Sequence, residues 1–247
     1  MNKKKLYKQS RQRNMNEERY HGPLITNEVV LGYIKIYPWI NLFFSILIVG
    51  IGLKGWYSDY YGVIRGVFTT CVVINLLGII LSFFHDLINQ FKSLTYILIA
   101  LVVGTDILWL DFIGMTSFLS KNNSTVPADF SSEKVLFYTI PLIFLFIFST
   151  ALYSWYYLPK NQGKIWAFNR WETYGGKEKG KKQERLFNFG VAFVAVMLVP
   201  AILTGYIDNV FGISFGILIT VTLPAVMVDA VYAAIYIRKH PDYDELN

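Results

Sequence analysis

Six long stretches of apolar residues, with the charges gathered between them, constrain this chain more than any other feature of its sequence. A transmembrane helix needs about 20 mostly apolar residues to cross the hydrocarbon core of a bilayer. Composition agrees, because 54% of the 247 residues are hydrophobic, 16% are charged and the mean hydropathy is +0.39. The sequence therefore predicts an all-α polytopic membrane helical bundle with six transmembrane helices. The predicted spans are residues 36–53, 66–84, 94–118, 135–158, 186–206 and 213–237.

The Lys and Arg residues set the orientation of these spans, since basic residues are retained on the cytoplasmic side of a membrane. Of the 23 Lys and Arg residues, 19 fall in the two terminal segments and in the loops on their side of a six-span bundle. The other 4 are Lys54, Arg65, Lys121 and Lys134. An odd number of spans would place one of the two basic clusters outside. We therefore expect both ends of the chain in the cytoplasm.

This topology divides the chain into three parts. Residues 1–35 form a basic cytoplasmic segment, residues 36–237 form the six-helix transmembrane domain, and residues 238–247 form a cytoplasmic tail. Within the transmembrane domain, residues 159–185 form a cytoplasmic loop rich in basic and aromatic side chains. Tyr and Trp side chains also gather at several predicted span ends, where the membrane interface favours them.

Ionisable side chains within the spans are candidate functional residues, because they are costly inside a bilayer. Asp106 lies at the middle of the third span, and Asp229 lies in the sixth, about 12 Å from its cytoplasmic end. Tyr232 follows Asp229 by three residues and shares its helix face. Two interpretations stay open: Asp106 and Asp229 share a proton or cation near mid-membrane, or each is a neutral acid hydrogen-bonded between helices. The second is favoured.

Asp111 and Arg65 form a second candidate pair, which we interpret as structural. Asp111 follows Asp106 by five residues, so the two carboxylates point about 140° apart and cannot face one partner. Arg65 begins the second span on the outer face, toward which Asp111 lies. We therefore predict an ion pair between Arg65 and Asp111, with a transport role as the alternative.

The third span is marginal by itself. Its thirteen Leu, Ile, Val and Phe residues favour insertion by about 0.3–0.6 kcal/mol each, against about 2.5–3.5 kcal/mol for each acid at a helix centre. The two contributions nearly cancel. We therefore expect this helix to depend on the rest of the bundle for its place in the membrane.

Two basic segments on the cytoplasmic side are candidate surfaces for anionic lipid or for a membrane or cytoplasmic protein partner. Each Lys or Arg beside a membrane attracts anionic lipid by about 1 kcal/mol. In the loop, aromatic side chains are interleaved with the charges, and residues 165–174 could form a short surface helix. Both segments could equally serve only as topology signals. The candidate residues are Lys3, Lys4, Lys5, Lys164, Trp166, Arg170, Trp171, Lys177, Lys179, Lys181 and Lys182.

Small residues four positions apart predict close helix packing at three places near the outer face. Patterns of this kind are frequent, and we interpret them as contacts within the bundle. The pairs are Gly62 with Gly66, Ala201 with Gly205, and Gly212 with Gly216.

The motifs of several enzyme classes are missing from the sequence. His21, His85 and His240 lie outside the span centres, and no paired-His motif is present to hold a catalytic metal in the membrane. The sequence contains no Gly-x-Ser-x-Gly nucleophile elbow and no Walker loop. The basic residues belong to no soluble domain that would suit nucleic acid. We expect a non-enzymatic protein without metal or cofactor.

These features favour a helical-bundle protein that acts through membrane partners, as an accessory protein of a secretion system or as an immunity protein against a toxin. The alternative is a small transporter or permease subunit that uses Asp106 and Asp229. Six spans with inner termini resemble the membrane subunits of ABC-2-type exporters, in topology alone. Abundant Lys, Asn, Ile, Tyr and Phe suit an AT-rich genome. We therefore expect the plasma membrane of a Gram-positive bacterium.

Overall fold

The computed structural model describes residues 29–52, 61–119, 132–156 and 206–239, all of which belong to helices or to short connections between them. Five of the six helices are long and apolar enough to cross a membrane, and α4 is a short connector. The prediction of an all-α, multi-pass membrane protein is confirmed. The helices are α2 (Tyr33–Gly52), α3 (Tyr61–Ser82), α4 (His85–Gln90), α5 (Lys92–Leu119), α6 (Ser132–Tyr156) and α9 (Ile207–Lys239).

Five of the six predicted spans coincide with these long helices. The predicted fifth span, residues 186–206, lies outside the described residues except for Tyr206. All the residues proposed to bind lipid or partners, in segments 1–35 and 159–185, also lie outside the described residues. The three-part division of the chain stays a prediction.

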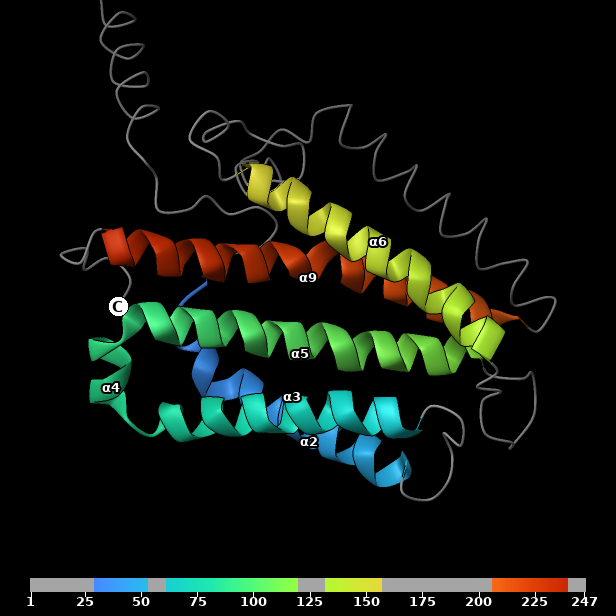
Figure 1. Ribbon diagram of the computed structural model, residues 1–247, viewed down its shortest axis with the longest axis horizontal. Coiled ribbons are helices and arrows are strands. Elements are labelled where there is room, and N and C mark those ends of the chain that lie inside the picture. Colours follow the sequence, from blue (N-terminus) through green and yellow to red (C-terminus); the bar gives the residue numbers. More distant parts are fainter. Residues whose placement is uncertain (1–28, 53–60, 120–131, 157–205, 240–247) are drawn as a thin grey trace, which may run out of the picture.

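The helices stack in layers with α5 at the centre (Figure 1). α9 lies along one side of α5 and makes its most extensive contacts, while α2 and α3 pack together on the other side. α6 crosses α9 on the face turned away from α2 and α3. The end of the bundle where α5 ends and α6 and α9 begin is called the distal end below. The end that carries α4 is called the proximal end.

Among the five described spans α5 is the best buried, which agrees with the prediction of a marginal third helix. Within its most apolar window 56% of the residues are buried inside the bundle, against 11% for α6 and 28–33% for the other spans. Neighbouring helices therefore surround the span that carries two acids. This arrangement supports the expectation that α5 depends on the bundle for its position.

The closest helix approach lies between α5 and α9 near the distal end. A Cβ atom added to Gly212 would collide with the backbone of Gly114 and Phe118, and one added to Gly216 would collide with the hydroxyl of Tyr138. Glycine is thus required at this crossing because the two backbones touch. The predicted packing of Gly212 and Gly216 within the bundle is confirmed.

Gly62 and Gly66 do not take part in such packing among the described residues. A Cβ added to either meets no atom within 4 Å. The close approach of α3 to a neighbour occurs instead at Gly78, where an added Cβ would come 2.9 Å from Cγ of Pro38 in α2. The interpretation of Gly62 and Gly66 as a contact is therefore wrong for the described helices, none of which approaches this side of α3.

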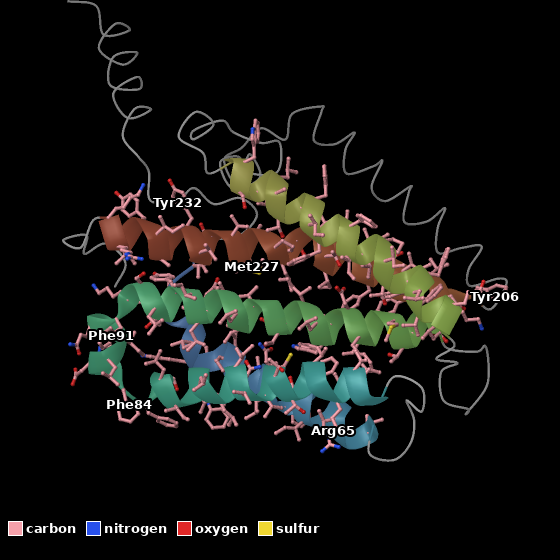
Figure 2. The ribbon with its side chains drawn as sticks, viewed as in Figure 1. Arg65, Phe84, Phe91, Tyr206, Met227 and Tyr232 are labelled. Carbon is pink, nitrogen blue, oxygen red and sulfur yellow. The ribbon has the colours of Figure 1, made fainter. Side chains whose placement is uncertain are left out.

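The helix ends differ most from the sequence prediction at the starts of α3 and α9, and α3 begins at Tyr61, five residues before the predicted start. α9 begins six residues before the predicted start, because Asp208 can occupy its first turn, where an acid suits the helix dipole, and Asn209 donates a hydrogen bond to the carbonyl of Phe118. The turn after α3 also contains the extra helix α4. Figure 2 shows Phe84 and Phe91 at the two ends of α4, where they flank a helix with only one buried side chain, Ile88.

Candidate functional site

Polar side chains from three helices meet inside the bundle. Asn41 of α2 donates from Nδ2 to the hydroxyl of Thr105 at 2.9 Å and to the carbonyl of Val102 at 3.0 Å, both in α5. Asn75 of α3 donates to the same Thr105 hydroxyl at 3.0 Å. The indole N–H of Trp109 donates to Oδ1 of Asn41 at 3.0 Å. We call Asn41, Asn75, Thr105, Asp106 and Trp109 the three-helix network.

Asp106 belongs to this network and is 7% exposed. Its side chain lies near Trp109 and Asn41, whose N–H groups donate to each other's helix, to Thr105 and to Val102. Trp109 also stacks on Phe44 of α2, with ring centroids 4.1 Å apart and planes within 5° of parallel. Asp106 is therefore buried beside the polar side chains that join α2 and α5, and its own hydrogen bonds between helices stay a prediction.

Sequence reasoning missed Asn41 and Asn75 because only ionisable groups were considered within the spans. Both side chains are fully buried, and both join α5 to a neighbour. A signal was available, since each is a lone asparagine within an apolar run and an amide in a bilayer needs partners as an acid does.

Asp229 occupies a different place, beside the start of α2. It is 6% exposed, and its Oδ2 accepts a hydrogen bond from the backbone N–H of Val29 at 3.1 Å. This contact satisfies a backbone donor that precedes the first turn of α2. Asp229 therefore joins the beginning of the first described helix to the last one.

The structure does not bring Asp106 and Asp229 together. In the antiparallel pair of α5 and α9, the hydroxyl of Ser93 donates to the carbonyl of Ala234 at 2.9 Å, so these two residues are level. Asp229, five residues before Ala234, is then level with Leu98, five residues after Ser93. Asp106 lies eight residues beyond Leu98, which is about 12 Å along the helix. A proton or cation shared directly by the two acids does not fit this spacing.

Tyr232 lies on the side of α9 turned away from α5 (Figure 2). It packs against buried Ala225 and Val228, as does Tyr153 of α6. The hydroxyl of Tyr153 donates to the carbonyl of Val221 at 2.7 Å. Tyr232 thus contributes to the packing of α6 on α9, and its proposed link to the carboxylate of Asp229 stays a prediction.

Asp111 faces α9 and is half-buried. Its two carboxylate oxygens accept from the hydroxyl of Thr220 at 3.1 and 3.3 Å. Arg65, its predicted partner, follows Val63 and precedes Val67 by two residues, so it points about 160° away from both of these side chains. Val63 and Val67 line the same groove as Asp111. Figure 2 shows Arg65 on the side of α3 away from α5, an arrangement that does not favour the predicted ion pair.

The groove that Asp111 lines has a volume of about 540 Å³ and lies between α3, α5 and α6. Met227 of α9 also lines it, and Figure 2 shows this side chain between α9 and α5. Thr105, Tyr138 and Thr139 contribute hydroxyl groups. Every other lining residue is apolar or glycine. The groove therefore offers one carboxylate and three hydroxyl groups in an otherwise apolar wall.

Neither Asp106 nor Asp229 lines this groove, and Tyr232 does not line it either. Within the described helices, no group of three or more His, Cys, Asp and Glu side chains could hold a metal ion. The cysteine of the chain, Cys71, is buried and unbonded in α3.

Comparison of the chain with family models finds no match. Comparisons with curated proteins and with solved structures find no match either.

Proposed function

We propose that this multi-pass membrane protein is a non-enzymatic, partner-binding component of a bacterial plasma membrane, in an accessory role in secretion or an immunity role against a toxin. One observation carries the proposal: the three acids within the spans belong to three separate helix–helix contacts and form no shared polar site. Asp106 contacts Asn41 of α2, Asp111 contacts Thr220 of α9, and Asp229 contacts the residue that begins the described chain.

The proposed topology has six spans and cytoplasmic ends. Tyr138 of α6 hydrogen-bonds Gly212 of α9, and Tyr153, further along α6, hydrogen-bonds Val221, further along α9. The two helices are therefore parallel and begin at the same end of the bundle. Between the end of α6 and the start of α9 the chain must return to the distal end, which supports the fifth span predicted from the sequence, residues 186–206. The 19 Lys and Arg residues on one side support a cytoplasmic proximal end.

The alternative is a transporter or permease subunit that uses Asp106 and Asp229. Such a role needs polar groups that converge on a path through the bundle. The separation of about 12 Å along the helices and the apolar wall of the groove favour the partner-binding role.

Thiol labelling tests the topology. The only native thiol, Cys71, is removed by Cys71→Ser, and single cysteines then replace Ser10, Ser58 and Ser124. An impermeant maleimide added to intact cells should label positions 58 and 124 and leave position 10 unlabelled. Labelling of position 10 in intact cells would overturn the proposed orientation.

Photo-crosslinking tests the partner-binding role. A photoreactive amino acid replaces Trp166 or Trp171 in the basic loop, with Trp56 outside the basic segments as the matched control. In membranes of the source organism, positions 166 and 171 should each form one discrete crosslinked product that position 56 does not form. Solute uptake by proteoliposomes that is lost in both Asp106→Asn and Asp229→Asn would instead establish transport and refute the proposal.

A further inference from the structure

We propose that the groove between α3, α5 and α6 is a binding site for a lipophilic cation, with the carboxylate of Asp111 as its counter-charge. The inference requires only that the chain spans a membrane, and it does not depend on the accessory or immunity role. A volume of about 540 Å³ falls within the range of small-molecule pockets, which is roughly 300–1,000 Å³.

The wall of the groove suits an apolar body. Leu108 and Phe112 of α5, Leu142 of α6 and Val67 of α3 line it from three helices. Gly104 lies in the same wall, and a Cβ added there would meet no atom within 4 Å. The missing side chain thus leaves room at the centre of the groove.

The charge of the groove suits a cation. Among the residues that line the groove, Asp111 supplies the carboxylate. The hydroxyl of Thr220 in α9 donates to both of its oxygens. An ionised carboxylate has about four acceptor positions, so one hydroxyl leaves capacity for a second partner. Arg65 lies on the other side of α3 and does not line the groove. In a bilayer an acid is most stable when a positive group lies beside it.

A neutral occupant would use the apolar wall and leave this charge unmatched. A lipid tail, an apolar partner helix or another segment of the chain could each cover the groove in that way. A cation matches both the wall and an ionised Asp111, whereas a neutral occupant would require Asp111 to be protonated, because desolvating a carboxylate is costly.

The test uses the full chain in lipid nanodiscs. The probe is tetraphenylphosphonium, a lipophilic cation, and the control is tetraphenylborate, an anion of nearly the same shape. Equilibrium dialysis of the radiolabelled ions measures binding above that of empty nanodiscs. We expect saturable binding of the cation and no saturable binding of the anion. Equal binding of the two ions, or no saturable binding of the cation, would overturn the proposal.

A first pair of variants tests the counter-charge. Asp111→Asn keeps the shape of the side chain and the Thr220 hydrogen bond but removes the charge. It should therefore weaken cation binding by ~10-fold or more, and a factor of ten corresponds to 1.4 kcal/mol. Asp106→Asn makes the same substitution in the three-helix network, outside the groove lining, and should leave cation binding unchanged. Equal losses in the two variants would refute the role of Asp111.

A second pair of variants tests whether the groove is the binding site. It keeps the proposal testable if Asp111→Asn does not fold. Gly104→Leu fills the groove and should abolish saturable binding. Gly66→Leu adds the same side chain where α3 faces open space and should bind as the unchanged protein does. Unaltered binding by Gly104→Leu would exclude the groove as the site.

Discussion

α5 is held on its two sides by interfaces of opposite kinds. Toward α2 and α3, the contact consists of directed hydrogen bonds from Asn41 and Asn75 to Thr105. Toward α9 at the distal end, the closest approach is between glycines, where the backbones of Gly114 and Gly212 touch beside the hydrogen bond from Asn209 to Phe118. Lipid tails are as apolar as the helices, so the hydrophobic effect does not drive helices together within a membrane. The two interfaces show the two remaining sources of attachment, hydrogen bonding and close van der Waals contact.

The difference predicts how each interface responds to substitution. A hydrogen bond in a membrane protein contributes on average about 0.6 kcal/mol, so the three-helix network should lose stability in small steps. A backbone contact has no side chain that can move aside. The glycine crossing should therefore fail abruptly when a single methyl group is added.

The largest effect is expected for Gly212→Ala. The added methyl group collides with the backbone of Gly114 and Phe118, so α5 and α9 must separate. We expect a loss of unfolding free energy of ~3 kcal/mol or more, at the upper end of the range for overpacking. Reversible unfolding in mixed micelles, followed by circular dichroism, measures it. A loss below that of Asn41→Leu would reverse the proposed contrast.

A smaller loss is expected for Asn41→Leu. The substitution removes three hydrogen bonds, to Val102, Thr105 and Trp109, and should cost about 2 kcal/mol at ~0.6 kcal/mol each. A double-mutant cycle with Trp109→Phe isolates the indole bond, because phenylalanine keeps a ring beside Phe44. Additive losses in the cycle would show that Asn41 and Trp109 are not coupled.

Thr220→Val should destabilise the α5–α9 interface slightly. It removes the hydroxyl that binds Asp111 while keeping the shape of the side chain, and we expect a loss of ~0.6–1.7 kcal/mol. Thr222→Val is the matched control, because the hydroxyl of Thr222 bonds the carbonyl of Leu218 within its own helix. Thermal unfolding of both variants should rank Thr220→Val below Thr222→Val in stability. Equal midpoints would contradict the assigned role of Thr220.

Gly66→Ala should cause no loss of stability at all. Its added methyl group meets no neighbour, and the higher helix propensity of alanine could raise the unfolding free energy by up to ~1 kcal/mol. The same micelle unfolding assay compares it with Gly212→Ala. Destabilisation by Gly66→Ala would mean that this side of α3 has a partner.

The sequence predicted the spans well because each is defined by its own composition. The region 94–118 has the composition of a membrane helix independently of its neighbours, and α5 of the structure covers it. Contacts between helices are a different matter. Gly62–Gly66 and Gly212–Gly216 have the same spacing, yet only the second pair touches another helix. The spacing of the glycines shows that a helix allows close packing, and the neighbouring helix determines whether that packing forms.

The candidate site followed the same rule. Burial of Asp106 and Asp229 could be predicted, because both lie in apolar runs. Their separation could not, because it depends on the register of α5 against α9. The groove beside Asp111 combines side chains from four helices, so no local pattern in the sequence indicates it.

The central position of α5 also has a consequence during synthesis, because its main neighbour α9 is made much later. α5 ends at Leu119 and its principal neighbour α9 begins at Ile207, so 87 residues are made between them. At roughly 5–20 residues per second, the ribosome needs about 4–17 s to supply them. During that interval the span that carries Asp106 and Asp111 has α2 and α3 beside it but not α9. Until α9 is inserted, α5 lacks its main helix neighbour. Synthesis halted before residue 207 should therefore leave a fragment that membrane proteases recognise.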